Sequence, residues 1–458
     1  MSNNAGRAMT DDRAREALAL AERAIAYAMR DGVTEAEAVV MSDDAALTRF
    51  ANSQIHQNVA ETNVAVNLRV VRGRRVGVAS TGRTDDESLR RLADNAAAIA
   101  SVVEELEDWG GLPGPTEVTA VAAGYSATTA NASPESRAED VRAVIAAADA
   151  AGVTAYGSFS TGTETLAVAN SKDVRVSGTR TVAQLITVSM SPDGGSGYAE
   201  AASVDSSTID GAAIGAEAAE KARSTVDARS LEPGDYPVVL EEYAVVDLLD
   251  MLGYLGFSAL AVQEGRSFVE PGKQIGSELV TITDDGADPA GLPMWFDYEG
   301  VAKQRVPLIE RGVCRGVVYD SQTAARAGVS STGHGLPAPN PYGPFPLNMV
   351  MEPGTVTRDD LIGGLDRGLL VTRFHYTNPV HPKLAIVTGM TRDGTFLVED
   401  GEIVGPIRNL RFTQSYLQAL SGTVAVASER KTLRGFLGGV VVPAVRIEGW
   451  TFTGATEH

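Results

Sequence analysis

Residues 389–403 read GMTRDGTFLVEDGEI and contain two Asp-Gly pairs, Asp393-Gly394 and Asp400-Gly401, each between apolar runs. An Asp-Gly pair in this setting is the strongest short-range signal for a β-hairpin, because the turn needs residues that tolerate positive φ. A third turn of this kind is expected at Arg311-Gly312. We therefore predict a β-meander over residues 384–404, within a C-terminal half that forms a mostly antiparallel, barrel-like sheet.

Other elements frame this sheet. A strand at residues 236–240 (YPVVL) is followed by one helix over roughly residues 243–260. The tail VVVPAVRI, residues 440–447, predicts a last strand. Pro443 is expected at an edge or a bulge of this strand, because proline cannot donate a ladder hydrogen bond.

The N-terminal half contains an internal repeat, since Ala51-Asn52-Ser53 recurs as Ala169-Asn170-Ser171. Helical sequence precedes each copy, over about residues 11–29 and 134–151, and an alternating strand follows each, at residues 64–70 and 181–188. A long alanine-rich helix ends each unit. We therefore predict two helix–strands–helix units that share one sheet, with a chance recurrence of the tripeptide as the alternative.

The helix ends carry their own signals. Ser133 is the expected cap and Gly152 the expected stop of the second opening helix. The first closing helix is expected to begin at a capping box, TDDE at residues 84–87. The second closing helix runs over about residues 209–226. Four of its alanines are expected to allow close packing: Ala212, Ala216, Ala219 and Ala222.

The predicted fold class is α+β, with a duplicated N-terminal half and a β-rich C-terminal half. A chain of 458 residues exceeds one ordinary core, so two or three domains are expected. The glycine- and proline-rich stretch GGLPGP at residues 110–115 and the pair Pro233-Gly234 mark the linkers. We predict domains at residues 1–110, 111–232 and 233–458.

Composition limits the partners and the compartment. The formal net charge is −20, and the arginines at positions 69, 72, 74 and 75 around a hairpin turn at Gly73 are expected to form a solvated edge, so no nucleic-acid partner is predicted. No apolar run approaches the length of a membrane span or a signal core. The single cysteine excludes an internal disulfide and is typical of a reducing compartment. We expect a cytoplasmic protein without membrane contact.

Five segments carry a resemblance to a known family. They are TRFANSQIHQ at residues 48–57, FDYEGV at 296–301, STG at 331–333, the stretch at 389–403, and NLRFTQS at 409–415. They follow one another in order along nearly the whole chain. Together they resemble the TldD/PmbA metallopeptidase family, in its PmbA or TldE branch.

The resemblance implies that the family's catalytic branch holds zinc through HExxxH on the helix after a strand like residues 237–240, with a cysteine near the C-terminus as third ligand. Such a site needs two neutral imidazoles on one helical face and a glutamate as base. The corresponding helix reads EEYAVVDLLDMLGY over residues 241–254, and no histidine lies between His56 and His334. We therefore expect this chain to bind no metal or cofactor and to hold no catalytic residue of the family type.

Four residues are weak candidates for other chemistry. Asp247 and Asp250, three positions apart on the helix, could hold a hard cation such as magnesium, although solvated helix acids are commoner. Cys314 and His334 could form a nucleophile and its base, or part of an improvised metal site. The plainer interpretation places both in ordinary loop or strand positions.

The resemblance implies a TldE-like subunit of a two-component TldD/TldE-type zinc metallopeptidase that acts on unfolded or leader peptides. The zinc would belong to a TldD-like catalytic partner, and this chain would supply chamber wall and interface. Two alternatives stay open. One is a homodimeric peptide- or protein-binding module, and the other is an autonomous hydrolase that uses Cys314, His334 or the acidic pair.

Overall fold

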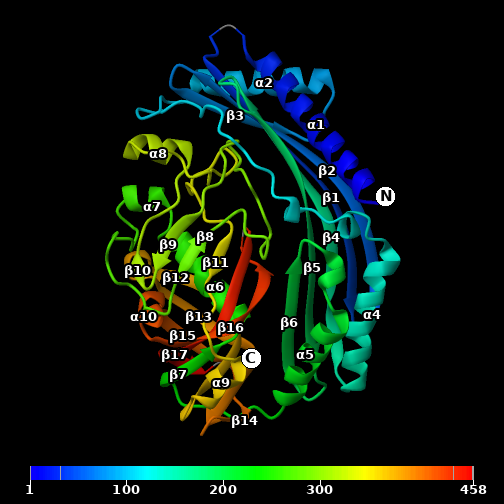
Figure 1. Ribbon diagram of the computed structural model, residues 1–458, viewed down its shortest axis with the longest axis vertical. Helices are drawn as coiled ribbons and strands as arrows, with labels where there is room; N and C mark the ends of the chain where they lie inside the picture. Colours follow the sequence, from blue (N-terminus) through cyan, green and yellow to red (C-terminus); the bar gives the residue numbers. More distant parts are fainter. Residues whose placement is uncertain (1, 31, 437, 456–458) are drawn as a thin grey trace.

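The computed structural model describes residues 2–30, 32–436 and 438–455. Two β-rich halves face each other, and the helices of the N-terminal half cover the outer side of its long, curved sheet (Figure 1). The fold is α+β, as predicted from the sequence.

The N-terminal half consists of two units with the same order of elements. The first comprises α1 (Ser2–Ala28), β1 (Glu35–Ala51), β2 (Gln54–Arg72), β3 (Arg75–Thr81) and α2 (Asp86–Val102). The second comprises α4 (Pro134–Ala150), β4 (Thr154–Asn170), β5 (Arg175–Met190), β6 (Ser196–Ser203) and α5 (Gly211–Ser224). The short helix α3 (Ala127–Ala130) lies between them. One six-stranded sheet in the order β3-β2-β1-β4-β5-β6 joins the two meanders, so β1 and β4 pair antiparallel at its centre.

The repeated tripeptide forms the turn at the end of the first strand in each unit, and its serine ties the two units together. Ser53 exchanges hydrogen bonds with the backbone of Ala155 at the start of β4, through its amide (3.0 Å) and its hydroxyl (3.1 Å). Ser171 makes the same two bonds to Ala36 at the start of β1, at 2.8 and 3.0 Å. The predicted duplication is therefore confirmed, because each unit's turn holds the other unit's first strand.

The closing helices pack on glycines at matching positions. A Cβ atom at Gly77 of β3 would lie 2.1 Å from the carbonyl oxygen of Ala96 and 2.5 Å from the amide nitrogen of Ala100. A Cβ atom at Gly197 of β6 would meet α5 at the same two distances, from Ala218 and Ala222 respectively. Each closing helix therefore rests directly on the backbone of its strand.

Several helix details differ from the predictions. The cap of α2 is Asp85, whose carboxylate accepts from the amide of Ser88 at 2.9 Å, so Thr84 is not the cap. In α5, Ala219 and Ala222 are buried, but Ala212 and Ala216 are exposed because Gly211, Ile214, Gly215 and Ala218 form the packed face instead. The cap at Ser133 and the left-handed Gly152 after α4 are confirmed.

The C-terminal half is dominated by strands. Its strands are β7 (Gly234–Leu240), β8 (Ile282–Asp284), β9 (Val306–Glu310), β10 (Val313–Cys314), β11 (Met349–Met351), β12 (Arg367–His381), β13 (Ile386–Glu399), β14 (Glu402–Pro406), β15 (Leu410–Ser415), β16 (Thr423–Arg434) and β17 (Gly439–Ala455). Its helices are α6 (Glu242–Leu255), α7 (Ala259–Gln263), α8 (Ser321–Ala327), α9 (Arg358–Gly363) and α10 (Tyr416–Ser421). The single helix predicted over residues 243–260 is two helices, because the backbone leaves the helical conformation at Gly256, where φ is −140°, and α7 begins only after Ser258.

Five of these strands close into a ring. The pairs β7–β12, β12–β13, β13–β15, β15–β17 and β17–β7 are all hydrogen-bonded, and all but the parallel β7–β12 pair are antiparallel. The core under this ring holds Trp450, whose ring stacks on Phe374 with centroids 4.9 Å apart. The barrel-like expectation is confirmed.

The two Asp-Gly pairs of residues 389–403 behave differently. Asp400-Gly401 forms the β13–β14 turn and Arg311-Gly312 the β9–β10 turn, as predicted. The turn predicted at Asp393-Gly394 is wrong, because this pair forms a bulge inside β13 opposite Thr372. Asp393 is buried there and paired with Arg373, which accounts for its place in a strand.

Among the described residues, no helix combines the length and the apolar character that crossing a bilayer requires. The domain boundaries predicted at residues 110 and 232 stay predictions.

The glycine contacts generate a stability prediction. Gly77→Ala and Gly197→Ala should each lower the free energy of unfolding by roughly 3 kcal/mol, because the added methyl group meets helix backbone that cannot rotate away. Gly114→Ala is the matched control, since a Cβ there meets nothing within 4 Å. Chemical denaturation measures the free energy of unfolding of all three variants. A loss confined to one of the two sites would contradict the equivalence of the units.

Candidate functional site

The main cavity, of about 820 Å³, lies between the C-terminal half and the edge strand of the N-terminal sheet. Its walls come from α6, β12, the end of β16, the loop before β11, and β6. A second cavity of about 370 Å³ lies over the sheet's inner face, and Arg434 lines both. The space between the two halves is therefore the place where this protein can hold a ligand.

Helix α6 forms one wall of the main cavity. Leu248, Leu249 and Leu252 are buried in the core, whereas Asp247 and Asp250, one turn apart, line the cavity. The carboxylate of Asp247 accepts from the hydroxyls of Thr377 (2.7 Å) and Tyr416 (3.1 Å). The carboxylate of Asp250 accepts a hydrogen bond from the amide of Phe436 at 2.7 Å.

Burial changes the titration of both acids. It raises the pKa of Asp247 to about 6, against the lowering effect of the Thr377 and Tyr416 hydrogen bonds. It raises the pKa of Asp250 to about 7, and the neighbouring Asp247 adds to this shift. Within the described residues, no lysine, arginine or histidine forms an ion pair with either acid. Both carboxyls therefore change charge near neutral pH.

The opposite wall is held by the stretch that bears the Asp393-Gly394 bulge. Asp393 accepts from Nε of Arg373 at 2.7 Å, and the guanidinium of Arg373 lies 4.3 Å from the ring centroid of Tyr198. The Tyr198 hydroxyl donates to Glu200 at 2.5 Å. The bulge thus positions an arginine and a tyrosine on the cavity wall.

Near the start of α6, by contrast, Glu217, Glu241 and Glu242 have cationic partners. Lys221 of α5 pairs with Glu241, the residue before α6, at 2.6 Å, and Lys431 of β16 lies 3.0 Å from Glu217. Burial disfavours the charge on Glu217, but Lys221 and Lys431 outweigh it and lower its pKa to about 2. This network joins the two halves and contains residues that sequence reasoning missed.

Cys314 lies in β10, fully buried in the apolar core. Burial raises the pKa of its thiol, which makes it a poor nucleophile. It lines neither of the two larger cavities. The sequence offered His334 as its base, but the hydrogen bonds of the His334 ring go to Thr332 and Asp284.

His334 is also fully buried, in the loop that follows STG at residues 331–333. Its ring contacts Asp284 at 2.7 Å and the hydroxyl of Thr332 at 2.9 Å, and Lys303 lies 3.2 Å from the same carboxylate. Burial and Lys303 lower the pKa of His334 against the opposing effect of Asp284. The histidine therefore fixes a loop to β8 and stands apart from Cys314 and the acid pair.

The FDYEGV segment, residues 296–301, joins the two halves. Asp297 accepts from the amides of Glu299 and Val301, both at 2.9 Å, and from that of Gly335 at 2.6 Å. Gly300 has φ 74° and lies against Val168, Val174 and Val176 of the N-terminal sheet, where a Cβ would come within 2.5 Å of Val174. In this structure the segment therefore attaches the C-terminal half to the N-terminal sheet.

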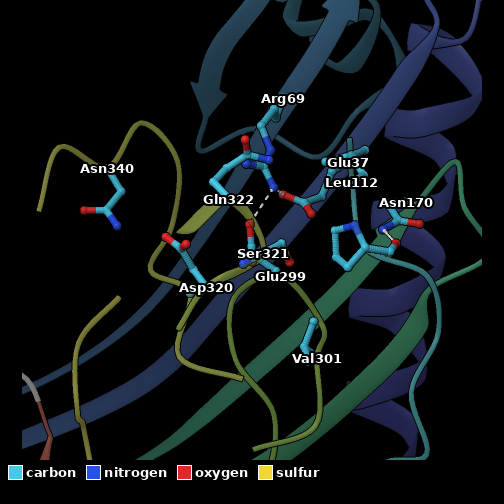
Figure 2. Close-up of polar contacts among 12 residues, drawn as sticks. Glu37, Arg69, Leu112, Asn170, Glu299, Val301, Asp320, Ser321, Gln322 and Asn340 are labelled. Atoms are coloured by element: carbon cyan, nitrogen blue, oxygen red, sulfur yellow. Dashed lines mark hydrogen bonds and ion pairs between the residues drawn. The ribbon is translucent and has the colours of Figure 1, made fainter. Parts of the chain in front are cut away.

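Glu299 of this segment meets a buried charge from the sheet. Figure 2 shows Arg69 of β2 between Glu37 and Glu299, at 2.7 and 3.3 Å. Glu299 also accepts from the amide of Ser321 at 2.8 Å. The expectation of a solvated edge is wrong for Arg69, which is only 9% exposed because its strand position faces the junction. Glu37 was missed as well, although a charged residue within the strand sequence EAEAVV was a visible signal.

Among the described residues, no group of three or more His, Cys, Asp or Glu side chains is arranged to hold a metal ion. Helix α6 presents two carboxylates and no imidazole to the cavity, which does not fit zinc chemistry of the HExxxH type.

Comparison with known proteins adds independent information. The chain matches the profile of the PmbA/TldA metallopeptidase C-terminal domain over residues 233–454, and that of PmbA/TldA metallopeptidase domain 1 over residues 36–100. It is thus a metallopeptidase-like protein. Since the two matched regions together cover more than half of its length, the chain belongs to the TldD/PmbA metallopeptidase family.

Individual relatives are distant. A metalloprotease of Methanothermobacter thermautotrophicus is 27% identical over 232 residues, covering 49% of this chain and 50% of the relative. A TldD homolog of Buchnera aphidicola is 28% identical over 259 residues, covering 52% of each. The chain therefore spans about half the length of the curated relatives it matches. The crystal structure of TldE from Thermococcus kodakarensis shares the fold, with a TM-score of 0.85 and 22% identity over 94% of this chain and 99% of that one.

The junction predicts a pH dependence of stability. Burial raises the pKa of Glu37 to about 7 against the lowering effect of Arg69, whereas the unfolded carboxyl titrates near 4.5. The folded form therefore keeps a proton that the unfolded form releases, and stability falls as pH rises from 5 to 7, by at most about 1.4 kcal/mol per pH unit for this group.

Glu37→Gln should remove the part of the pH dependence of stability that Glu37 contributes, because the amide carries no titrating proton. Denaturation curves at pH 5, 6, 7 and 8 test it, with Glu402→Gln on the exposed strand β14 as the matched control. Equal slopes for Glu37→Gln and the wild type would show that the carboxyl is already ionised in the folded protein.

Proposed function

We propose that this chain is a TldE-like, non-hydrolytic subunit of a two-component zinc metallopeptidase that acts on unfolded or leader peptides. A TldD-like partner holds the zinc and carries out hydrolysis. This chain completes the chamber and contacts the peptide. The observation that carries the proposal is that α6, in a family fold preserved throughout, turns two aspartates and no histidine toward the main cavity.

Two features support peptide as the ligand. Strand β3 pairs with β2 only from Val66 onward, so residues 54–65 of β2 have no strand on their outer side within the described chain. A free edge of this kind can add an extended peptide through main-chain hydrogen bonds with little sequence preference. The main cavity is large enough for side chains of such a peptide.

An autonomous hydrolase built on the chain's own nucleophile is disfavoured by the same structure. Cys314 is buried in the apolar core and His334 is tied to Asp284 and Lys303. Neither faces the main cavity. A homodimeric binding module remains an outcome that the experiment below distinguishes.

The test is reconstitution. Alone, the chain should cleave an unstructured fluorogenic peptide no faster than buffer. Co-expressed with a TldD-like protein that carries HExxxH, it should form a stable complex that cleaves the peptide and is inhibited by a zinc chelator. Size-exclusion chromatography with light scattering reports the assembly, and peptide fluorescence reports the activity.

Two variants examine this chain's own chemistry in the complex. Cys314→Ala and His334→Gln should leave kcat/KM within a few-fold of wild type, because neither side chain reaches the cavity. A loss of about a thousandfold with the complex intact, equivalent to roughly 4 kcal/mol of transition-state stabilisation, would contradict the proposal. A stable homodimer that never joins the TldD-like protein would favour the binding module instead.

A further inference from the structure

The main cavity carries negative charge that nothing in the described chain neutralises. Asp247 and Asp250 are held by two hydroxyls and one amide, and all three donors are neutral. Oδ1 of Asp250 receives no hydrogen bond from a described residue. The acids near the start of α6 are different, since Glu217, Glu241 and Glu242 each contact a lysine or an arginine. Asp247 and Asp250 therefore lack the partner cation that these three acids have.

Aromatic side chains gather around the same cavity. Tyr254, Tyr342, Tyr376 and Phe436 line it and are between 41% and 76% exposed, and the buried Phe374 lies among them. Tyr376 also has φ 58° beside a bulge in β12, a backbone conformation that a bulky residue rarely adopts. Exposed rings around a negatively charged wall are the surroundings that attract an organic cation, through cation–π contact and ion pairing together.

A metal ion fits this cavity less well. Magnesium and calcium are held by oxygen ligands, some of them water molecules, and the faces of the rings around the two carboxylates supply none. An ammonium or guanidinium group on an alkyl chain can use the carboxylates and the rings at once.

We propose that the main cavity binds the cationic group of an extended peptide, either an N-terminal ammonium or a lysine or arginine side chain, between the Asp247–Asp250 pair and the aromatic rim. The peptide nature of the ligand rests on the proposed function. The preference for a cation rests on the cavity alone, so the two can fail separately.

The remaining charged groups around the cavity do not cancel this preference. Arg373 is neutralised by Asp393, and Arg434 faces Glu164 at 3.8 Å. Glu200 adds a further carboxyl, which is bonded to Tyr198 and to Gln184. Burial raises the pKa of Tyr243 and of the neighbouring Tyr416, so these two hydroxyls add no charge to the cavity.

Binding should therefore strengthen with pH. Burial keeps the Asp250 and Asp247 carboxyls partly protonated, with pKa values of about 7 and about 6. A cationic ligand favours the ionised forms, so its affinity should rise between about pH 5.5 and 7, where an α-ammonium and a lysine both stay charged, while protons are released. A neutral ligand should show no such rise.

The test measures binding to the isolated full-length chain by fluorescence anisotropy. The probes are four ten-residue Gly/Ser/Ala peptides with a C-terminal fluorophore. One has a free N-terminus, one is N-acetylated with a single lysine, one is N-acetylated and neutral, and one is N-acetylated with a single glutamate. We expect at least one cationic peptide to bind about tenfold more tightly than the neutral one, and the glutamate peptide to bind most weakly. The two cationic probes distinguish the two sources of charge.

Asp250→Asn should reduce the affinity for the cationic peptide about tenfold and reduce its pH dependence to the part that Asp247 contributes, because the amide can still accept from Phe436 but carries no charge. Asp359→Asn, on the exposed side of α9, removes the same charge elsewhere and should change nothing. Tyr254→Leu should lower the affinity for the cationic peptide several-fold and change the affinity for the neutral peptide little. Circular dichroism confirms that each variant is folded.

Equal affinity for the neutral and cationic peptides, or no effect of Asp250→Asn in a folded protein, would overturn the proposal. Tighter binding of magnesium ions than of either cationic peptide, measured by competition, would overturn it in favour of a metal site. If the chain binds the cationic peptide but never joins a TldD-like protein, the cavity assignment stands and the two-component function fails.

Discussion

Arg69 lies buried between Glu37 and Glu299, and the meeting of the two halves depends on this contact. A guanidinium removed from water needs partners on every side, and the sheet supplies only one of the two carboxylates. The other comes from the FDYEGV segment, which reaches the sheet only because Gly300 can lie against three valines. The cavities between the halves take their shape from this docking, so the charge at the junction controls the geometry of the candidate site.

Sequence patterns predicted the elements well where a local rule decides them. Such rules act through the backbone of the segment itself or of a neighbouring strand. Examples are the duplicated tripeptide, the cap Ser133, the helix stop Gly152 and the Asp400-Gly401 turn. The Asp393-Gly394 turn failed because a distant residue, Arg373, makes a buried Asp393 more favourable in a strand than in a turn. No pattern of spacing within residues 389–403 contains that information.

The site was harder to predict for the same reason. Asp247 and Asp250 were identified from their spacing on one helix, but their meaning depends on what surrounds them. The aromatic residues of the rim come from α6, β12, the loop before β11 and the segment after β16. Only the closed ring of strands brings these segments together. Sequence reasoning likewise placed Arg69 at a solvated edge, because the partner Glu299 lies in the other half of the chain.

Two groups of acids around α6 therefore have different physical roles. Glu217 and Glu241 face lysines of both halves, and their pairing adds to the attachment of the sheet to the barrel. Asp247 and Asp250 face the cavity, where burial disfavours their charge and no cation of the described chain offsets that cost. Carboxyls that serve stability alone are better paired or replaced by apolar residues. An unpaired acid pair on the wall of a ligand-sized cavity is therefore better explained by a cation that arrives from outside than by the stability of the fold.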